Sequence, residues 1–119
     1  MAIARRSARA ACSAWNLGDE TAAVAALVLS ELVTNAVRYA SGPSIRILVD
    51  RPTADRLYFG VVDRAPCDLP RVADPDLEST SGRGLLLIDA YALRWCWVRL
   101  GPAGRPWGKQ CWAELEACP

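Results

Sequence analysis

A long apolar stretch, residues 19–40, constrains the fold most, because it reads as one helix and carries two polar side chains within its apolar face. At 100° per residue, Asn35 falls within the apolar stripe, Glu31 lies at its edge, and Arg38 flanks Glu31. A buried carboxylate or amide without partners costs several kcal/mol. The pair therefore needs either protein partners or a ligand.

Two interpretations fit this stretch equally well when it is taken alone. In the first, Glu31 forms an ion pair with Arg38, and Asn35 bonds to neighbouring backbone. In the second, Glu31 and Asn35 contact a ligand and a metal ion. Other parts of the sequence are needed to choose between these two interpretations.

The other segments predict a two-layer α+β sandwich. Apolar residues alternate with polar ones in 44–50, β-formers dominate 56–63, and the polar stretch 51–55 fits a hairpin turn. Helices mixed with hairpins favour one four-stranded sheet with helices on a single face. The expected elements are helices 2–15, 19–40 and 82–92, strands 44–50, 56–63, 93–100 and 109–115, and a loop at 64–81.

Junction residues support this division. Gly18 fits the end of the first helix, and Asp19 fits the N-cap of the second. The basic first 18 residues suit a first helix better than a transit peptide. No apolar run reaches the roughly 18 to 20 residues that span a bilayer, since Glu31 interrupts the best candidate. The whole chain, 1–119, is expected to be one domain.

Composition excludes several classes of protein. The net charge of +1 gives no field that would favour nucleic acid. The five cysteines form no C-x-x-C pair, and the absence of histidine excludes a Cys/His zinc site, a histidine general base and a His-based catalytic triad. Reduced thiols and a cytoplasmic location are expected.

Further polar signals favour a ligand site. Asp63 ends a strand and enters the long loop, where a carboxylate serves either as a ligand contact or as a turn former. Gly82-Arg83-Gly84 precedes a predicted helix start, where backbone N–H groups and the helix dipole suit phosphate. No P-loop or Rossmann glycine pattern is present.

The tryptophans of the last two strands could serve either of two roles. Trp95 and Trp97 share one face by alternation, and Trp112 is expected to pair with them. Core packing is the simpler role for these rings, while a sheet face without helices could use them to contact a partner.

Four segments, ELVTNAVRYA, VVDRAP, GRGLLLIDA and GKQCWAEL, taken in order, resemble the boxes of the GHKL ATPase superfamily. That superfamily includes gyrase-type ATPases, histidine kinases and anti-sigma-factor serine kinases. The chain looks most similar to the small single-domain anti-sigma-factor-like ATP-binding proteins, over residues 3–116. The resemblance implies the Bergerat fold, with a mixed, mainly antiparallel sheet and helices on one face.

The resemblance also implies roles for individual residues. Glu31 would orient or activate the attacking group, Asn35 would help hold Mg²⁺ against the phosphates of ATP, and Asp63 would accept the adenine amino group. The resemblance assigns the remaining nucleotide contacts to Arg38, to Gly82, Arg83, Gly84 and Leu85 beside the phosphates, and to Gln110 near the adenine, where the family usually has Thr.

Three departures from the family pattern bear on function. Residues 63–67 lack both glycines of the D-x-G-x-G box beside the adenine. The ATP lid, about 64–81, is shorter than in histidine kinases, and with no histidine to phosphorylate this argues against a histidine-kinase role. The strand that usually precedes the first helix is lacking; it is either missing from this sequence or supplied by a partner.

Three functions follow. The first is an Mg·ATP-binding regulator that sequesters a sigma factor or phosphorylates a Ser/Thr of an anti-anti-sigma (STAS-type) partner, with Glu31 as base. The second is a degenerate GHKL-fold module that acts through protein contacts without catalysis. The third is an ATPase subunit of a larger signalling assembly. No membrane or direct nucleic-acid contact is expected, and homodimerisation is a further expectation.

Overall fold

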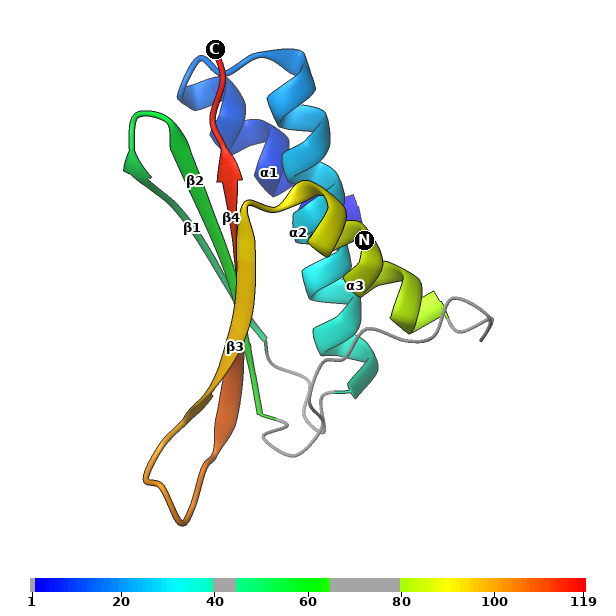
Figure 1. Cartoon of the computed structure of the whole chain (residues 1–119), viewed down its shortest axis with the longest axis vertical. Helices are drawn as coiled ribbons and strands as arrows, with labels where there is room; N and C mark the ends of the chain where they lie inside the picture. The colour runs from blue at the N-terminus through cyan, green and yellow to red at the C-terminus, as the bar shows by residue number, and fades with distance from the viewer. Residues whose placement is uncertain (1, 40–44, 65–79) are drawn as a thin grey trace.

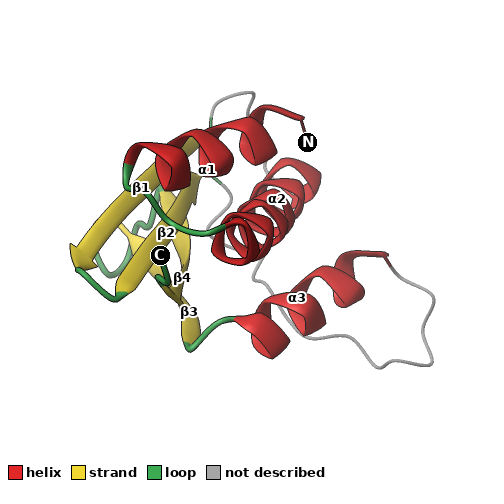
Figure 2. Ribbon diagram, turned by 90° about the horizontal axis from the view of Figure 1, so that it is seen from above, coloured by secondary structure: helices red, strands yellow, loops and turns green. Residues whose placement is uncertain are grey.

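A computed structural model of the chain describes residues 2–39, 45–64 and 80–119, and it leaves the side chains of 38, 39 and 80–85 undescribed. The helices lie on one side of a sheet, as Figures 1 and 2 show from two directions. The elements are α1 (Ala2–Ala14), α2 (Asp19–Tyr39), β1 (Arg46–Thr53), β2 (Arg56–Asp63), α3 (Thr80–Tyr91), β3 (Arg94–Leu100) and β4 (Gly108–Glu116). The predicted two-layer α+β sandwich is confirmed.

The four strands form one sheet in the order β1-β2-β4-β3. All three pairs are antiparallel, so the described sheet is not mixed. The first hairpin is tighter than predicted, because β1 continues to Thr53 and β2 begins at Arg56. The central β2–β4 pair joins segments far apart in sequence and places the start of β4 beside the end of β2.

The core lies between the sheet and α2. Alternation along β2 turns Leu57, Phe59 and Val61 toward the helices, and all three are fully buried. Residues directly opposite them on β4 complete the layer, because cross-strand partners share a face. These partners are Leu115, Ala113 and Cys111.

Small side chains let α1 pack closely on α2. Ala4, Ala8 and Cys12 recur at the helical interval and are all buried. The helix ends through Asn16, whose φ of 56° is left-handed, while the N–H of Leu17 bonds to the carbonyl of Cys12. Asn16, not Gly18, is therefore the stop residue of α1.

Gly18 instead precedes α2, and Asp19 is the first helical residue rather than the cap. The C-terminal segment holds this end of α2. The carbonyl of Cys118 accepts hydrogen bonds from the Gly18 N–H at 2.9 Å and from the Thr21 hydroxyl at 3.0 Å. A side chain at Gly18 would press on the backbone of Pro119.

By length and hydropathy, residues 19–37 would suffice to cross a bilayer, contrary to the prediction that no stretch qualifies. However, 61% of that window is buried inside the domain. It packs against α1, α3 and the sheet, as Figure 2 shows. This packing is that of a core helix.

Candidate functional site

Asp63 and Lys109 form a buried ion pair at one end of the central strands. They face each other as the last register pair of β2 and β4, and the Lys109 Nζ lies 2.9 Å from the Asp63 Oδ1. Their exposed fractions are 1% and 2%. Both side chains share the helix-facing side of the sheet with Val61 and Cys111, since alternate residues share a face.

Sequence reasoning missed Lys109 and chose its neighbour. Gln110 lies opposite Val62 and Val98, so its side chain belongs to the sheet face without helices. There its Nε2 contacts the Tyr58 hydroxyl. The structure therefore places Gln110 on the opposite face of the sheet from Asp63, and its contact with adenine stays a prediction. Lys109 could have been found by counting alternate residues along the last strand from the position that pairs with Asp63.

The close approach of β4 to β2 depends on Gly108. A β-carbon there would overlap the carbonyl oxygen of Asp63. On the other side of Lys109, Arg99 of β3 lies opposite it in the register. One row of the sheet thus carries a carboxylate and two cations across β2, β4 and β3.

Glu31 and Asn35 lie on the margin of the buried face of α2, and both are half-buried. Asn35 is more exposed than was expected from its place within the apolar stripe. The buried residues Leu29, Leu32 and Ala36 all lie to one side of it on the helix. Among the side chains that the structure describes, neither Glu31 nor Asn35 has a hydrogen-bond or ion-pair partner. The alternative ion pair between Glu31 and Arg38 falls outside the described part of the structure, which does not include the Arg38 side chain.

The glycine pair falls inside α3 rather than before it, because the helix begins at Thr80. This corrects the predicted helix start. Gly82 lies in the first turn, where backbone N–H groups have no partner within the helix, whereas Gly84 lies beyond it. The side chains of Arg83 and Leu85, like the lid residues 65–79, are outside the described part of the chain.

The far end of α3 is tied to β3. The indole N–H of Trp95 donates to the Asp89 Oδ1 at 2.9 Å. Trp95 and Trp97 pack against the core on the helix-facing side, which agrees with their predicted shared face. Trp112 does not pair with them, because it lies opposite Cys96 on the other face.

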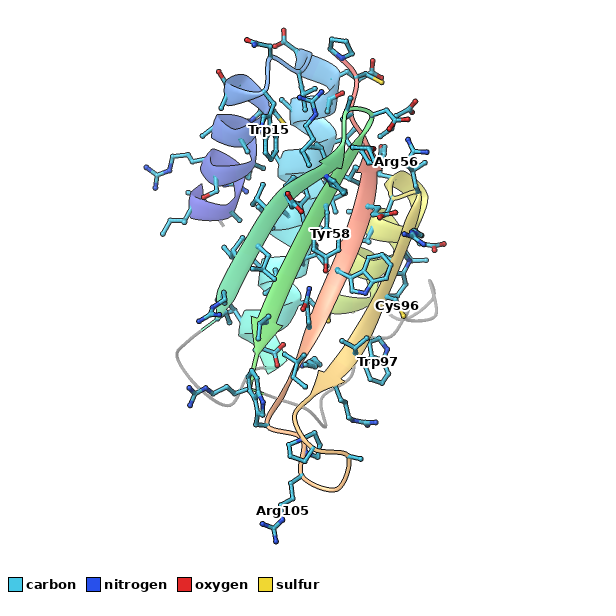
Figure 3. All side chains as sticks on the ribbon, turned by 90° about the vertical axis from the view of Figure 1, so that its left-hand side faces the viewer. Trp15, Arg56, Tyr58, Cys96, Trp97 and Arg105 are labelled. Atoms are coloured by element: carbon cyan, nitrogen blue, oxygen red, sulfur yellow. The ribbon has the colours of Figure 1, made fainter. Side chains whose placement is uncertain are left out.

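The face without helices carries its own side-chain network, seen in front of the helices in Figure 3. The rings of Tyr58 and Trp112 stack with centroids 5.9 Å apart, and the Arg94 guanidinium lies over Trp112. Arg94 also makes two hydrogen bonds to Glu114, which lower the pKa of that carboxyl. Burial raises the pKa of the Tyr58 hydroxyl.

The thiols in the described part of the chain differ in exposure. Cys12 and Cys111 are buried, while Cys96 and Cys118 are exposed. Burial raises the pKa of Cys111 to about 11 and raises that of Cys12. Among the described residues no group of three or more Cys, Asp or Glu side chains could hold a metal ion. A magnesium ion would therefore rely on one or two protein oxygens together with phosphate and water, which is its usual mode of binding.

Solved structures share this fold. The mycobacterial sensor histidine kinase MprB matches with a TM-score of 0.62 at 16% identity, over 86% of this chain and 74% of that one. Full-length ShkA in complex with AMPPNP matches with a TM-score of 0.52 at 18% identity, over 83% of this chain and 23% of that one. At these identities the likeness shows the fold alone. No curated protein matches the chain.

A family model gives the assignment. The model for the histidine kinase-like ATPase domain matches residues 1–105, which include α1, α2, the β1–β2 hairpin, α3 and β3. The match ends before β4, so the strand that carries Lys109 lies outside it. The chain belongs to the histidine kinase-like ATPase domain family, whose fold is that of the GHKL ATPases.

Proposed function

We propose that this domain binds Mg·ATP and regulates a sigma factor, either by sequestering it or by phosphorylating a Ser/Thr of an anti-anti-sigma (STAS-type) partner in the cytoplasm. Family membership implies ATP binding. The observation that carries the proposal is the half-buried pair Glu31 and Asn35, which has no partner among the described side chains. Polar groups at the margin of a core that lack protein partners can be satisfied by contacts with a bound ligand.

Each group would have a distinct role. Asn35 offers an amide oxygen, the hard ligand that Mg²⁺ prefers, and bound Mg²⁺ would supply charge neutralisation at the phosphates. The N–H groups of the first turn of α3, with Gly82, would face phosphate, near Arg38, Arg83, Gly84 and Leu85. Asp63 would lie at the adenine end.

Glu31 would act as general base. In the transfer, the partner hydroxyl oxygen forms a bond to the γ-phosphorus while the bond from that phosphorus to the bridging oxygen of ADP breaks. The hydroxyl proton passes to the Glu31 carboxylate, and ADP leaves. Positioning and charge neutralisation contribute most of the rate.

Binding is tested by titrating Mg·ATP while following tryptophan fluorescence and melting temperature. Ligand at a hundredfold excess over Kd stabilises the folded state by about 2.7 kcal/mol. Asn35→Ala should abolish the Mg²⁺-dependent part of the shift, while Thr34→Ala, on the exposed side of the same helix, should leave it intact. No shift at millimolar Mg·ATP would refute nucleotide binding.

Kinase activity is tested with γ-labelled ATP and a STAS-type protein. Label on the partner that is lost in Glu31→Gln, with ATP binding retained, supports the general-base role. Label transfer at the wild-type rate in Glu31→Gln contradicts it.

A second function is favoured by the Asp63–Lys109 pair, which places a cation against the proposed adenine acceptor. The domain would then act as a binding module without catalysis, through its surfaces. The exposed sheet face with Tyr58 and Trp112 suits a protein contact or a homodimer. Partner capture that is unaffected by ATP and by Glu31→Gln would support this function.

A further inference from the structure

The two edges of the sheet differ in how well they resist pairing with another strand. The strand order places β1 at one edge and β3 at the other, as Figure 3 shows. An edge strand presents unpaired backbone N–H and C=O groups, which can pair with a further strand. β1 carries two features that hinder such pairing. These are Pro52, which has no N–H group, and a register shift between Asp50 and Thr53.

β3 has neither feature. Its seven residues, Arg94–Leu100, include no proline, and all of them pair with β4 in an unbroken register. The middle of the strand, residues 95–98, carries no charge. The described part of the chain supplies no further strand beyond β3. A long, regular and uncharged edge of this kind favours the addition of a strand from another chain.

The charged side chains of β3 lie toward its ends and have contacts within the domain. Arg94 forms an ion pair with Glu114 of β4. The Arg99 guanidinium lies 5.3 Å from the centre of the Trp97 ring. Between them the edge carries Val98, a large apolar side chain that is 46% exposed. The charges therefore leave the middle of the edge open to an apolar strand.

A second copy of β3 is such a strand. Residues that pair across two strands share a face of the sheet, so a two-fold axis has to pass through a residue that pairs with its own copy. The register centred on Trp97 pairs all seven residues of β3. Its pairs are Trp97 with Trp97, Cys96 with Val98, Trp95 with Arg99, and Arg94 with Leu100. No like charges are directly opposite in this register, and arginine opposite tryptophan is a favourable pair.

We propose that β3 is a homodimer interface, in which the β3 strands of two copies pair antiparallel about Trp97 and join the sheets into one of eight strands, four from each copy. The proposal goes beyond nucleotide binding and does not depend on it. The sheet face with Tyr58 and Trp112 stays uncovered in both copies. Pairing along one edge buries less than the roughly 1,200–2,000 Å² of a stable interface, so the dimer is weak and depends on concentration.

Sedimentation velocity from micromolar to millimolar concentrations measures the dimer. The wild type should change from monomer to dimer over this range. Val98→Lys should raise the Kd of the dimer by about fivefold or more, because the register places the two lysines diagonally across the interface, about 7–8 Å apart. The matched control is Val37→Lys, which changes a similarly exposed valine of α2 and should leave the Kd unchanged.

A disulfide tests the register. Val98→Cys places a thiol opposite the exposed Cys96 of the second copy, where β-carbons about 4.5–5.5 Å apart lie near the separation that a disulfide requires. Mild oxidation should give a covalent dimer in which two copies of the tryptic peptide 95–99 are joined. The control Val98→Cys/Cys96→Ala should not be linked through this peptide.

Amide hydrogen exchange separates backbone pairing from a contact between side chains. The β3 amides of the wild type should exchange more slowly as protein concentration rises, because outward N–H groups gain partners in the dimer. The β1 amides, at the other edge, should exchange at a constant rate. This measurement needs no variant, so it decides even if Val98→Lys fails to fold by circular dichroism.

Two results would overturn the proposal. One is a wild type that remains a monomer at about 1 mM. The other is a dimer whose β3 amides exchange at the same rate at all concentrations and whose Kd is unchanged in Val98→Lys. That second result would assign the dimer to another surface, for which the face with Tyr58 and Trp112 is the next candidate.

Discussion

Gly108 lies so close to Asp63 that a β-carbon at residue 108 would overlap the Asp63 carbonyl oxygen. The contact involves the backbone of two adjacent strands, so neither partner can rotate away. It fixes the start of β4 against the end of β2 and, through the next residue, places Lys109 beside the carboxylate.

Gly108→Ala should therefore destabilise the domain by about 1–3 kcal/mol, the usual cost of forcing extra atoms into a packed site. Urea unfolding measures this loss. The matched control is Gly104→Ala in the β3–β4 connection, where a β-carbon meets nothing within 4 Å. Equal effects of the two substitutions would contradict the proposed contact.

The Asp63–Lys109 pair should show strong energetic coupling. Removing either partner leaves a buried charge and costs about 3–5 kcal/mol, while removing both costs less than the sum. A double-mutant cycle with Asp63→Ala and Lys109→Met measures the coupling. The exposed pair Asp55–Arg56 serves as the control and should show none. Additive effects of the two buried substitutions would disprove the coupling.

Glu31→Leu and Asn35→Leu should each leave the free energy of unfolding without nucleotide unchanged or slightly raised. The reason is that each replaces a half-buried polar group lacking a described partner by an apolar one. Chemical denaturation checks this, with Thr34→Leu on the exposed side of α2 as control. A loss of more than about 1 kcal/mol for Glu31→Leu alone would instead favour an internal pair between Glu31 and Arg38.

Stability should fall in alkali partly through Cys111. Burial raises its folded pKa from the ordinary value of 9.0 to about 11. A raised folded pKa contributes stability that is present below the unfolded pKa and lost as pH rises toward the folded one. Its share of the loss between pH 8 and 11 is on the order of 2 kcal/mol.

Unfolding free energies measured at several alkaline pH values test this contribution. Cys111→Ala should decline less steeply with pH than the wild type. The exposed Cys96→Ala should follow the wild-type slope. Identical slopes for all three proteins would show that Cys111 contributes nothing.

Acid should weaken the open face of the sheet through Glu114. Two hydrogen bonds from Arg94 lower the folded pKa of Glu114 below its unfolded value. A lowered folded pKa contributes stability that is present above the unfolded pKa, about 4.3, and lost as pH falls through the folded one. Glu114→Gln should therefore lack this component, so the melting temperatures of the two proteins should converge below pH 4.

The sequence predicted the fold well because the spacing of apolar residues in its helices and strands is regular. The alternation of 56–63 and the apolar stripe of 19–40 placed β2 and α2 almost to the residue. Helix ends were harder to predict, since Asn16, with its left-handed φ, ends the first helix where Gly18 was expected to end it. Short-range patterns do not reveal which of two candidate residues ends a helix.

The candidate site was predicted only in part. The positions of Glu31, Asn35 and Asp63 follow from periodicity, but the neighbour of Asp63 depends on how β4 registers with β2 across 46 residues of chain. A shift of one residue exchanges the two faces of a strand, so the sequence alone does not show that Lys109, and not Gln110, faces Asp63. The glycine pair was expected at the start of the helix rather than inside it, because no local signal marks a helix start at Thr80.

The long sequence separation of β2 and β4 has a consequence for folding kinetics. The α1–α2 pair and the two β-hairpins can form locally, whereas the central ladder has to close a much longer loop. We therefore expect the Asp63–Lys109 contact to form after the folding barrier. Substitutions at Lys109 should accelerate unfolding while leaving the folding rate nearly unchanged, so this contact would govern the lifetime of the folded state rather than the speed of reaching it.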